Sequence, residues 1–371
     1  MSLEFTNAKI SVRQFQILII LGLTGDSILI LPTIIASSAK QNAWLSMLIA
    51  YAAGLLIGGF FAAIANRMQG DSLIAAARRG FGRWLGSVVG LLFLFNFFMC
   101  GLTLVSELSQ FMTTQLMPET PVNAIILIFL TVVIVAYRYG VEAFARMGEL
   151  LFPAFTALFM VLAILSLSQA KIENVKPVAA EGLWPIMEGA IPVMSVAFIE
   201  MVVLLALVPH VATNKSLTKP ILKSFAAGGL FLFIIVALCV LVLGPNLMET
   251  KYYPTFLLAQ KITVGNFLER LEAILAFLWI ITVFYKTLLL FFALTSGLAQ
   301  WFKLRDSDML TVPLGMIMLV LTVVSTPNIT VYNQIIKYYY NWFDLMFCFI
   351  VPLLLLAGLI LRKKKGKAAS S

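Results

Sequence analysis

Charged residues are scarce in this sequence. Asp, Glu, Lys and Arg make up 12% of its 371 residues, whereas soluble globular domains carry about 25%. Hydrophobic residues stand in their place, at 61%, and the mean hydropathy is +1.00. The apolar runs reach the roughly 20 residues that a helix needs to cross a bilayer, and they recur from end to end. This pattern excludes a soluble domain and predicts an all-α polytopic membrane protein.

Histidine and cysteine are scarce as well. The only histidine, His210, stands at the end of an apolar run, and the three cysteines lie inside apolar runs: Cys100, Cys239 and Cys348. Such cysteines are most simply small packing residues. The sequence has no clustered His/Cys ligands, no Walker loop and no Ser-His-Asp arrangement, so we expect no enzyme activity, no metal and no cofactor.

The apolar runs divide into ten predicted membrane spans. Spans 1 to 10 cover residues 11–37, 42–65, 85–112, 122–138, 148–168, 184–210, 218–243, 267–300, 308–326 and 341–361. We expect span 1 not to be a cleavable signal peptide, because it lacks a small-residue cleavage site and another span follows directly. One transmembrane domain is expected over 1–371, with a basic tail at 362–371.

Lysine and arginine are distributed unevenly between alternate loops. Most of the 26 lie on one side: Lys9, Arg13, Arg67, Arg78, Arg79, Arg83, Arg138, Arg146, Lys215, Lys219, Lys223, Lys303, Arg305, Arg362, Lys363, Lys364, Lys365 and Lys367. The other side has Lys40, Lys171, Lys176, Lys251, Lys261, Arg270 and Lys337. The positive-inside rule therefore predicts that both termini are cytoplasmic. The basic loops indicate contact with anionic lipid headgroups rather than with nucleic acid.

The ten spans suggest an inverted repeat, because two sets of five spans have opposite orientations. Repeat one would cover about 11–168 and repeat two about 184–361. The first span of each half is irregular: "GLTGDS" interrupts span 1, and span 6, "LWPIMEGAIPVMSVAFIEMVVLLALVP", has Pro192 and Ser195 midway. One such residue alone is more often a kink or a packing spot. A matched pair of interruptions instead predicts an inverted-repeat transporter fold with its binding site at the breaks.

Four ionisable residues lie too deep in the spans to reach an interface easily: Asp26, Glu107, Glu200 and Lys286. Each charge at mid-bilayer costs at least about 2.5–3.5 kcal/mol. Lys286 therefore needs a counter-charge, for which Asp26 and Glu200 are the candidates. The group is either purely structural, or Lys286 replaces a coupling cation or carries a proton. Glu107 either faces an outer vestibule or hydrogen-bonds across helices.

Four other carboxylates lie nearer the ends of their spans. Glu188, Glu272 and Asp344 are within about a turn or two of the outer ends of spans 6, 8 and 10, and Glu149 is near the cytoplasmic end of span 5. We expect all four to be solvated at the interfaces. The polar stretch "NLMETKYYPTFLLAQKITVGNFLER" before span 8 predicts a short helical lid or an interfacial element on the outer side.

An amino acid is the expected ligand class. At a break, free N–H groups attract anions and unwound carbonyls attract ammonium groups, so one cavity can hold both ends of a zwitterion. The expected lining is Leu23, Thr24, Ser27, Ile28, Phe97, Phe98, Gly101, Met194, Ser195, Val196, Ala197, Phe198, Trp279 and Thr282.

Several stretches resemble the B subunits of spore nutrient-germinant receptors, in the amino acid–polyamine–organocation superfamily. They are "KISVRQFQILIILGLTGDSILILP", "AKQNAWLSMLIAYAAGLLIGG", "YYPTFLLAQKITVGNFLERLEAILAFLWIITVFYKT" and the basic tail. The resemblance implies a leucine-transporter-like five-plus-five fold and a nutrient-sensing subunit, commonly for an amino acid. It also implies a complex with a larger membrane A subunit and a lipoprotein C subunit in the spore inner membrane.

By the same resemblance, Thr24, Gly25, Asp26 and Ser27 match the family's ligand loop in span 1, and the residues around Ser195 match the break in span 6. A small or hydroxyl residue is expected where Asp26 stands, which leaves the charge of the ligand open. Two functions remain open too: a receptor subunit that signals to its partners, and an amino acid permease coupled to protons or sodium, since one fold hosts both.

Overall fold

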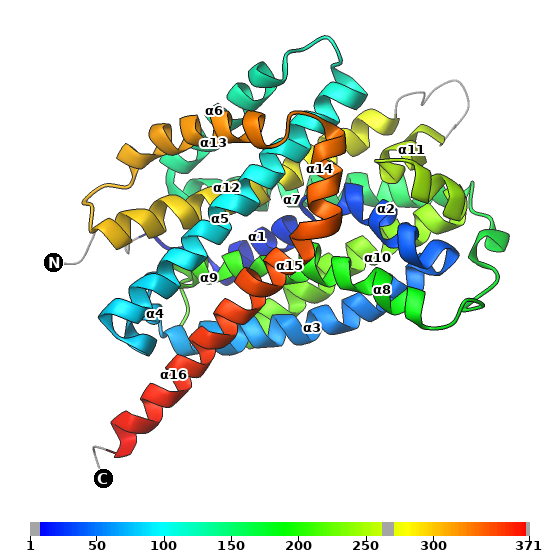
Figure 1. Ribbon diagram of the computed structural model, residues 1–371. Helices are drawn as coiled ribbons and strands as arrows, with labels where there is room; N and C mark the ends of the chain where they lie inside the picture. The colour runs from blue at the N-terminus through cyan, green and yellow to red at the C-terminus, as the bar shows by residue number, and fades with distance from the viewer. Residues whose placement is uncertain (1–7, 262–270, 369–371) are drawn as a thin grey trace.

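The computed structural model of the chain describes residues 8–261 and 271–368, and the regular structure in these residues is helical (Figure 1). Within them, eight helices are long and apolar enough to cross a membrane, and two shorter apolar helices, Val12–Thr24 and Val122–Arg138, lie in the predicted spans 1 and 4. Each of the ten predicted spans therefore contains helix. The predicted all-α, multi-span architecture is confirmed.

Sixteen α-helices follow one another along the described residues. They are α1 (Val12–Thr24), α2 (Ser27–Ala39), α3 (Ala43–Met68), α4 (Leu73–Phe81), α5 (Arg83–Phe111), α6 (Val122–Arg138), α7 (Gly140–Leu167), α8 (Trp184–Val193), α9 (Leu204–Leu207), α10 (Thr218–Thr250), α11 (Pro254–Lys261), α12 (Leu271–Phe302), α13 (Thr311–Ser325), α14 (Ile329–Ile335), α15 (Asn341–Asp344) and α16 (Val351–Ala368). The predicted basic tail at 362–371 thus begins as a continuation of α16, which projects from the body in Figure 1.

Spans 6 and 8 lie at the centre of the molecule. In their most apolar stretches, 78% of span 6 and 72% of α12 are buried, against 28% of α7 and 22% of α13. The apolar residues of α7 and α13 therefore face the lipid, whereas those of spans 6 and 8 pack against protein. Polar side chains on the two central spans are held away from both water and lipid.

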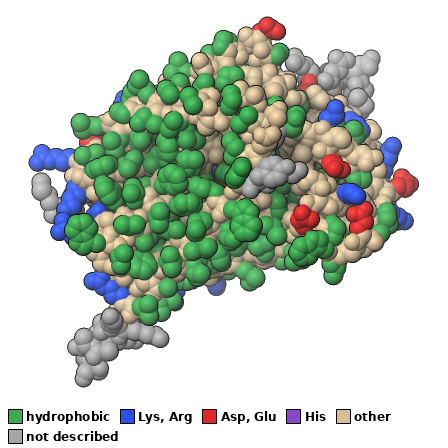
Figure 2. Space-filling model, in the orientation of Figure 1, with side chains coloured by type: hydrophobic (Ala, Val, Ile, Leu, Met, Phe, Trp, Pro, Cys, Tyr) green, Lys and Arg blue, Asp and Glu red, His purple; other side chains and the backbone are tan. Residues whose placement is uncertain are grey.

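The two ends of the molecule differ in charge. Figure 2 shows Lys and Arg side chains gathered at one end, a band of hydrophobic side chains across the middle, and mixed charges at the other end. At the basic end, Arg13 Nε lies 3.3 Å from a carboxylate oxygen of Glu149, which is partly exposed, as expected for an interfacial residue. At the other end, Lys40 Nζ lies 3.0 Å from Glu181. The exposed side chain of Glu188 also agrees with its predicted solvation.

Two short helices lie outside the predicted spans. α4 is amphipathic and buries Leu73, Ile74, Ala76 and Ala77 beside α5 and α16, after an N-cap at Ser72. The described part of the predicted outer lid, 246–261, contains the end of α10 and the whole of α11. α11 packs into the protein: Thr255 is fully buried, and its hydroxyl donates 2.8 Å to the Ile28 carbonyl of α2. The rest of the predicted lid, at 262–270, lies outside the described residues.

Candidate functional site

Span 1 is interrupted between α1 and α2, at Gly25 and Asp26. Gly25 has φ 2° and ψ −116°, which ends α1, and α2 restarts at Ser27. The Thr282 hydroxyl of α12 donates 2.9 Å to the Gly25 carbonyl that the break frees. Free backbone groups within a bilayer need such partners in the protein. The hydrogen bond from Thr282 therefore stabilises the break within the protein core.

Lys286, on α12, connects the two irregular spans. Its Nζ lies 2.6 Å from Asp26 Oδ1, forms an ion pair with Glu200 Oε2, and donates 3.2 Å to the Val196 carbonyl. All three charged side chains are buried. Both expected counter-charges thus lie against Lys286, and the ammonium holds span 1, span 6 and α12 together.

Glycine at position 25 allows this contact. A Cβ built on Gly25 would lie 2.5 Å from Lys286 Cδ and 2.8 Å from the Gly22 carbonyl oxygen. Real Cβ atoms do not approach so closely, so a side chain here would displace Lys286 or the backbone. The aliphatic stem of Lys286 fills the space beside the break.

Span 6 is irregular in a different way from span 1. After α8 the chain passes through a π-helical turn, Met194–Phe198, and a 3₁₀ stretch, Ile199–Val203, without unwinding. A change from wide to tight helical pitch disturbs the regular hydrogen-bond ladder, and π turns recur at functional sites. Here the Val196 carbonyl is turned to Lys286. The expected break in span 6 is thus a change of pitch, whereas span 1 has a true gap in its helix.

Asp344 belongs to the core, and its predicted solvation is wrong. The residue is fully buried, and its Oδ2 accepts a 2.7 Å hydrogen bond from the Ser195 hydroxyl. Span 10 reaches this point through a π turn, Ile336–Tyr340, and continues through another, Leu345–Ile350. These turns alter which face of the helix points inward, so distance from the end of the span was a poor guide to solvation.

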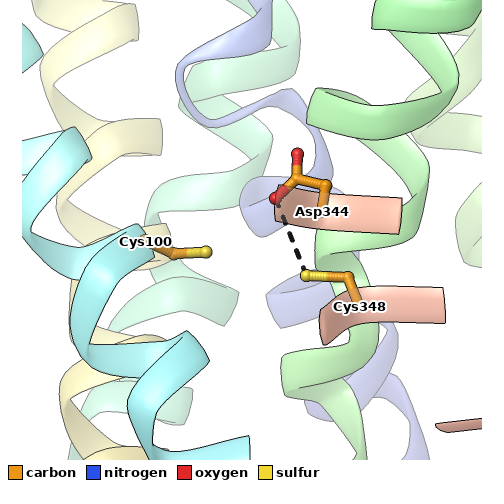
Figure 3. A group of neighbouring side chains, drawn as sticks. All are labelled: Cys100, Asp344 and Cys348. Carbon is orange, nitrogen blue, oxygen red and sulfur yellow. Dashed lines mark hydrogen bonds between the residues drawn. The ribbon is translucent and has the colours of Figure 1, made fainter. Parts of the chain in front are cut away.

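Two thiols lie beside Asp344. The Sγ atoms of Cys100 and Cys348 and a carboxylate oxygen of Asp344 lie within 4.8 Å of one another, as Figure 3 shows for their side chains. Two thiols and a carboxylate are a donor set that suits a soft divalent metal. In the structure, however, both thiols lie in donor positions to Asn96 Oδ1, Cys100 at 3.6 Å and Cys348 at 3.2 Å, and Cys348 Sγ also lies 3.8 Å from Asp344 Oδ1. The cluster is therefore satisfied as neutral thiols.

Glu107 lies in the same polar core, and no cation of the described residues forms an ion pair with it. The Tyr332 hydroxyl donates 3.0 Å to Glu107 Oε2, and Oε1 has no hydrogen-bond partner among the described residues. The buried carboxylates Asp26, Glu107, Glu200 and Asp344 thus outnumber the one buried ammonium of the described core. Since buried uncompensated charge is costly, protons or a cationic ligand group must neutralise the remainder.

The structure brings some of the expected lining residues together and separates others. Around the break and Lys286 lie Thr24, Gly25, Asp26, Ser27, Ser195, Val196 and Thr282. Other members face elsewhere: Leu23 packs on Gly228 of α10, Phe198 on Gly54 of α3, and Gly101 towards Met318 of α13.

The remaining members of the expected lining are Ile28, Phe97, Phe98, Met194, Ala197 and Trp279, and Ile28 is fully buried. Trp279 packs on Phe111, with ring centroids 4.6 Å apart, and Phe97 stacks on Phe93 at 6.3 Å. Ala197 is fully buried, whereas Phe98 and Met194 are half-buried. The polar members of the expected lining therefore lie together around the break in span 1 and Lys286. The large apolar members Leu23, Phe97, Phe198 and Trp279 pack between helices instead.

This chain is similar to spore germination proteins over most of its length. A family model described as "Spore germination protein" matches residues 9–330. Spore germination protein KB of Bacillus subtilis (strain 168) is 27% identical over 362 residues, which covers 96% of each chain. Spore germination protein A2 of the same strain is 24% identical over 314 residues, or 84% of this chain and 86% of its own.

Solved structures show the fold. MhsT in complex with L-phenylalanine superposes with a TM-score of 0.68 at 14% identity, covering 94% of this chain and 98% of its own. Mhp1, a nucleobase-cation-symport-1 family transporter, has a TM-score of 0.63 at 16% identity, covering 97% and 92%. Both have the leucine-transporter fold, so the predicted five-plus-five architecture is confirmed.

Proposed function

This chain belongs to the spore germination protein family, and from that premise we propose that it is the nutrient-sensing subunit of a spore germinant receptor. It resides in the spore inner membrane with both termini cytoplasmic, and it signals to partner A and C subunits. The basic end in Figure 2 supports this orientation through the positive-inside rule. The proposal of A and C subunits as partners rests on the family resemblance.

The ligand we propose is a small nutrient, an amino acid, bound at mid-membrane between spans 1 and 6. The contacts of Lys286 carry this proposal. Its ammonium donates hydrogen bonds to the Asp26 carboxylate and the Val196 carbonyl. The ammonium group of an amino acid could bind to the same two acceptors. The surplus of buried carboxylates favours a ligand with a positive group. MhsT, which shares the fold, was solved with L-phenylalanine.

Signalling follows from the way Lys286 joins three elements. A ligand that takes over Asp26 or the Val196 carbonyl weakens the link from α12 to one span, so the relative stability of two arrangements changes. A ligand shifts such an equilibrium only by its difference in affinity for the two states. In a receptor, partner subunits detect the shift, and no flux is needed.

Gly25→Ala tests this proposal in the complex. The added Cβ displaces Lys286, so we expect assembly with the A and C subunits to persist and the response to amino acids to be lost. The matched control is Gly59→Ala in α3, because a Cβ there meets no atom within 4 Å. A full response in Gly25→Ala, or equal loss in both variants, would count against a ligand site at the break.

A permease is the second candidate, favoured by the buried Asp26, Glu200 and Lys286 group. An ammonium fixed between two carboxylates can replace a coupling sodium or carry a proton. The purified chain in liposomes would then accumulate labelled amino acid under a proton gradient. Binding without accumulation under either a proton or a sodium gradient supports the receptor. Accumulation that requires sodium contradicts a cation-replacing role for Lys286.

A further inference from the structure

A cavity of about 690 Å³ opens at the basic end of the molecule, where α4, the start of α5 and the end of α12 meet. Three of its lining side chains are cationic, Arg78, Arg83 and Lys303, and the others include Trp84, Val88 and Leu91. The cavity thus combines a cationic part with an apolar part. It is remote from Lys286, which lies within the buried core.

Local structure fixes the walls of this cavity. Gly82, with φ +85°, makes the turn from α4 into α5, and the lack of a side chain at Gly86 lets the α4 backbone approach α5. Arg78 Nε donates 3.0 Å to the Ser87 hydroxyl, and Trp301 Nε1 donates 3.1 Å to the Ser87 carbonyl. These bonds join α4, α5 and α12, so the cationic groups are held on a rigid frame.

The three cations have no carboxylate partners in the described part of the chain. The ion pairs of the same end go to other residues: Arg13 with Glu149, Arg79 with Asp71, and Arg146 with Glu142. Arg78 bonds to neutral groups, and Arg83 and Lys303 are exposed. A cluster of unpaired cations in a cavity attracts an anion, and guanidinium groups suit phosphate in particular.

An apolar stripe leads from the cavity along α5. Trp84, Val88, Leu91 and Phe95 are 86%, 56%, 46% and 45% exposed, and their spacing of three or four residues puts them on one helix face. The stripe begins at the basic end and runs into the hydrophobic part of α5. Tryptophan is typical of the membrane–water interface. A ligand that follows this surface therefore needs an anionic head and an apolar chain.

We propose that this cavity is a specific site for an anionic phospholipid. The phosphate lies among Arg78, Arg83 and Lys303, and one acyl chain lies along the α5 stripe. Basic pockets between spans on the positively charged side are known to hold such headgroups. A soluble phosphate would bind to the cations but would make no use of the apolar stripe. An acidic peptide could contact the stripe only if the stripe lay outside the bilayer. The proposal is independent of the germination role.

The test measures lipid retention by the full-length chain. The purified protein in detergent is titrated with phosphatidylglycerol and followed by native mass spectrometry and by thermal unfolding. The variant is Arg83→Gln with Lys303→Gln, both exposed. The matched control is Lys219→Gln with Lys223→Gln, which removes the same charge from exposed positions of the same end outside the cavity. Size-exclusion profiles of the variants check that each remains folded.

We expect the Arg83/Lys303 variant to bind phosphatidylglycerol roughly 25-fold more weakly, since each cation near an anionic lipid contributes a factor of about five. The Lys219/Lys223 control should bind like the unmodified chain, and phosphatidylcholine should bind weakly to all three proteins. Equal retention in variant and control overturns the proposal. So does equal binding of phosphatidylcholine, or a shift of the same size with soluble glycerol phosphate, which lacks the acyl chain.

Discussion

The buried carboxylates of this protein form two groups with different partners. Asp26 and Glu200 lie against the Lys286 ammonium, which ties three spans together. Glu107 accepts from a tyrosine hydroxyl, Asp344 accepts from a serine hydroxyl and from the Cys348 thiol, and no cation of the described residues lies within ion-pair distance of either. The first group depends on charge to hold helices together. The second group has only neutral hydrogen-bond donors as partners, so the two groups should respond differently to loss of charge.

Lys286→Met should have the largest effect. It leaves Asp26 and Glu200 buried without their cation, and breaking a buried ion pair in this way costs about 3–5 kcal/mol. We expect the chain to insert, to unfold at lower denaturant concentration in mixed micelles, and to lose its response. Lys219→Met, at an exposed position, is the control.

The triple variant Lys286→Met, Asp26→Asn, Glu200→Gln sharpens this prediction. Neutralising all three groups removes the uncompensated charge, so part of the stability should return while the response stays lost. If Lys286→Met alone costs less than about 1 kcal/mol, the ammonium is not what joins the spans.

Asp26→Asn and Asp344→Asn compare the two groups directly. Asp26→Asn removes a charge-assisted bond to Lys286 and should cost about 1.5–3 kcal/mol. Asp344→Asn keeps an oxygen that can accept from Ser195 Oγ, so its cost should stay below about 1 kcal/mol. The free energy of unfolding of each variant, measured in the same micelles, gives the difference. Equal costs would show that Asp344 also depends on its charge.

Tyr332→Phe tests the second group of carboxylates, Glu107 and Asp344, without changing a charge. The change removes the hydroxyl that donates to Glu107, whose other oxygen has no partner among the described residues. A buried acceptor left without a donor costs about 1–3 kcal/mol. Tyr339→Phe is the matched control, because Tyr339 is 70% exposed. The same small loss of stability in both variants would mean that the Tyr332 hydroxyl does not support Glu107.

The sequence allowed much of this fold to be predicted for a physical reason. Hydropathy marks spans because an unsatisfied backbone cannot cross lipid. The counter-charges of Lys286 could be named because few residues at that depth can neutralise an ammonium. Both arguments depend on energies so large that local packing does not reverse them.

The parts that sequence did not predict depend on small changes in helix geometry. Asp344 was placed by its distance from the end of span 10, and the π turns on either side of α15 made that distance misleading. Pro192 and Ser195 predict an interruption of span 6, but they do not specify its form, a change of pitch where the span contacts α3 and α12. α4 was missed because a nine-residue amphipathic helix leaves little hydropathy signal.

Cys348→Ala should have a small effect, comparable with that of Asp344→Asn. A thiol is a weak donor, so the loss of its 3.8 Å contact with Asp344 costs little, and Asn96 Oδ1 still receives the Cys100 thiol after the change. The cost should be about 1 kcal/mol, mostly from the lost sulfur volume. Cys239→Ala is the control, since Cys239 is equally buried and contacts Thr255 at 3.8 Å. An excess of more than about 1 kcal/mol at Cys348 would show that its sulfur carries charge or ligates a metal beside Asp344. The second group would then be ionic like the first, and the contrast between the two would fail.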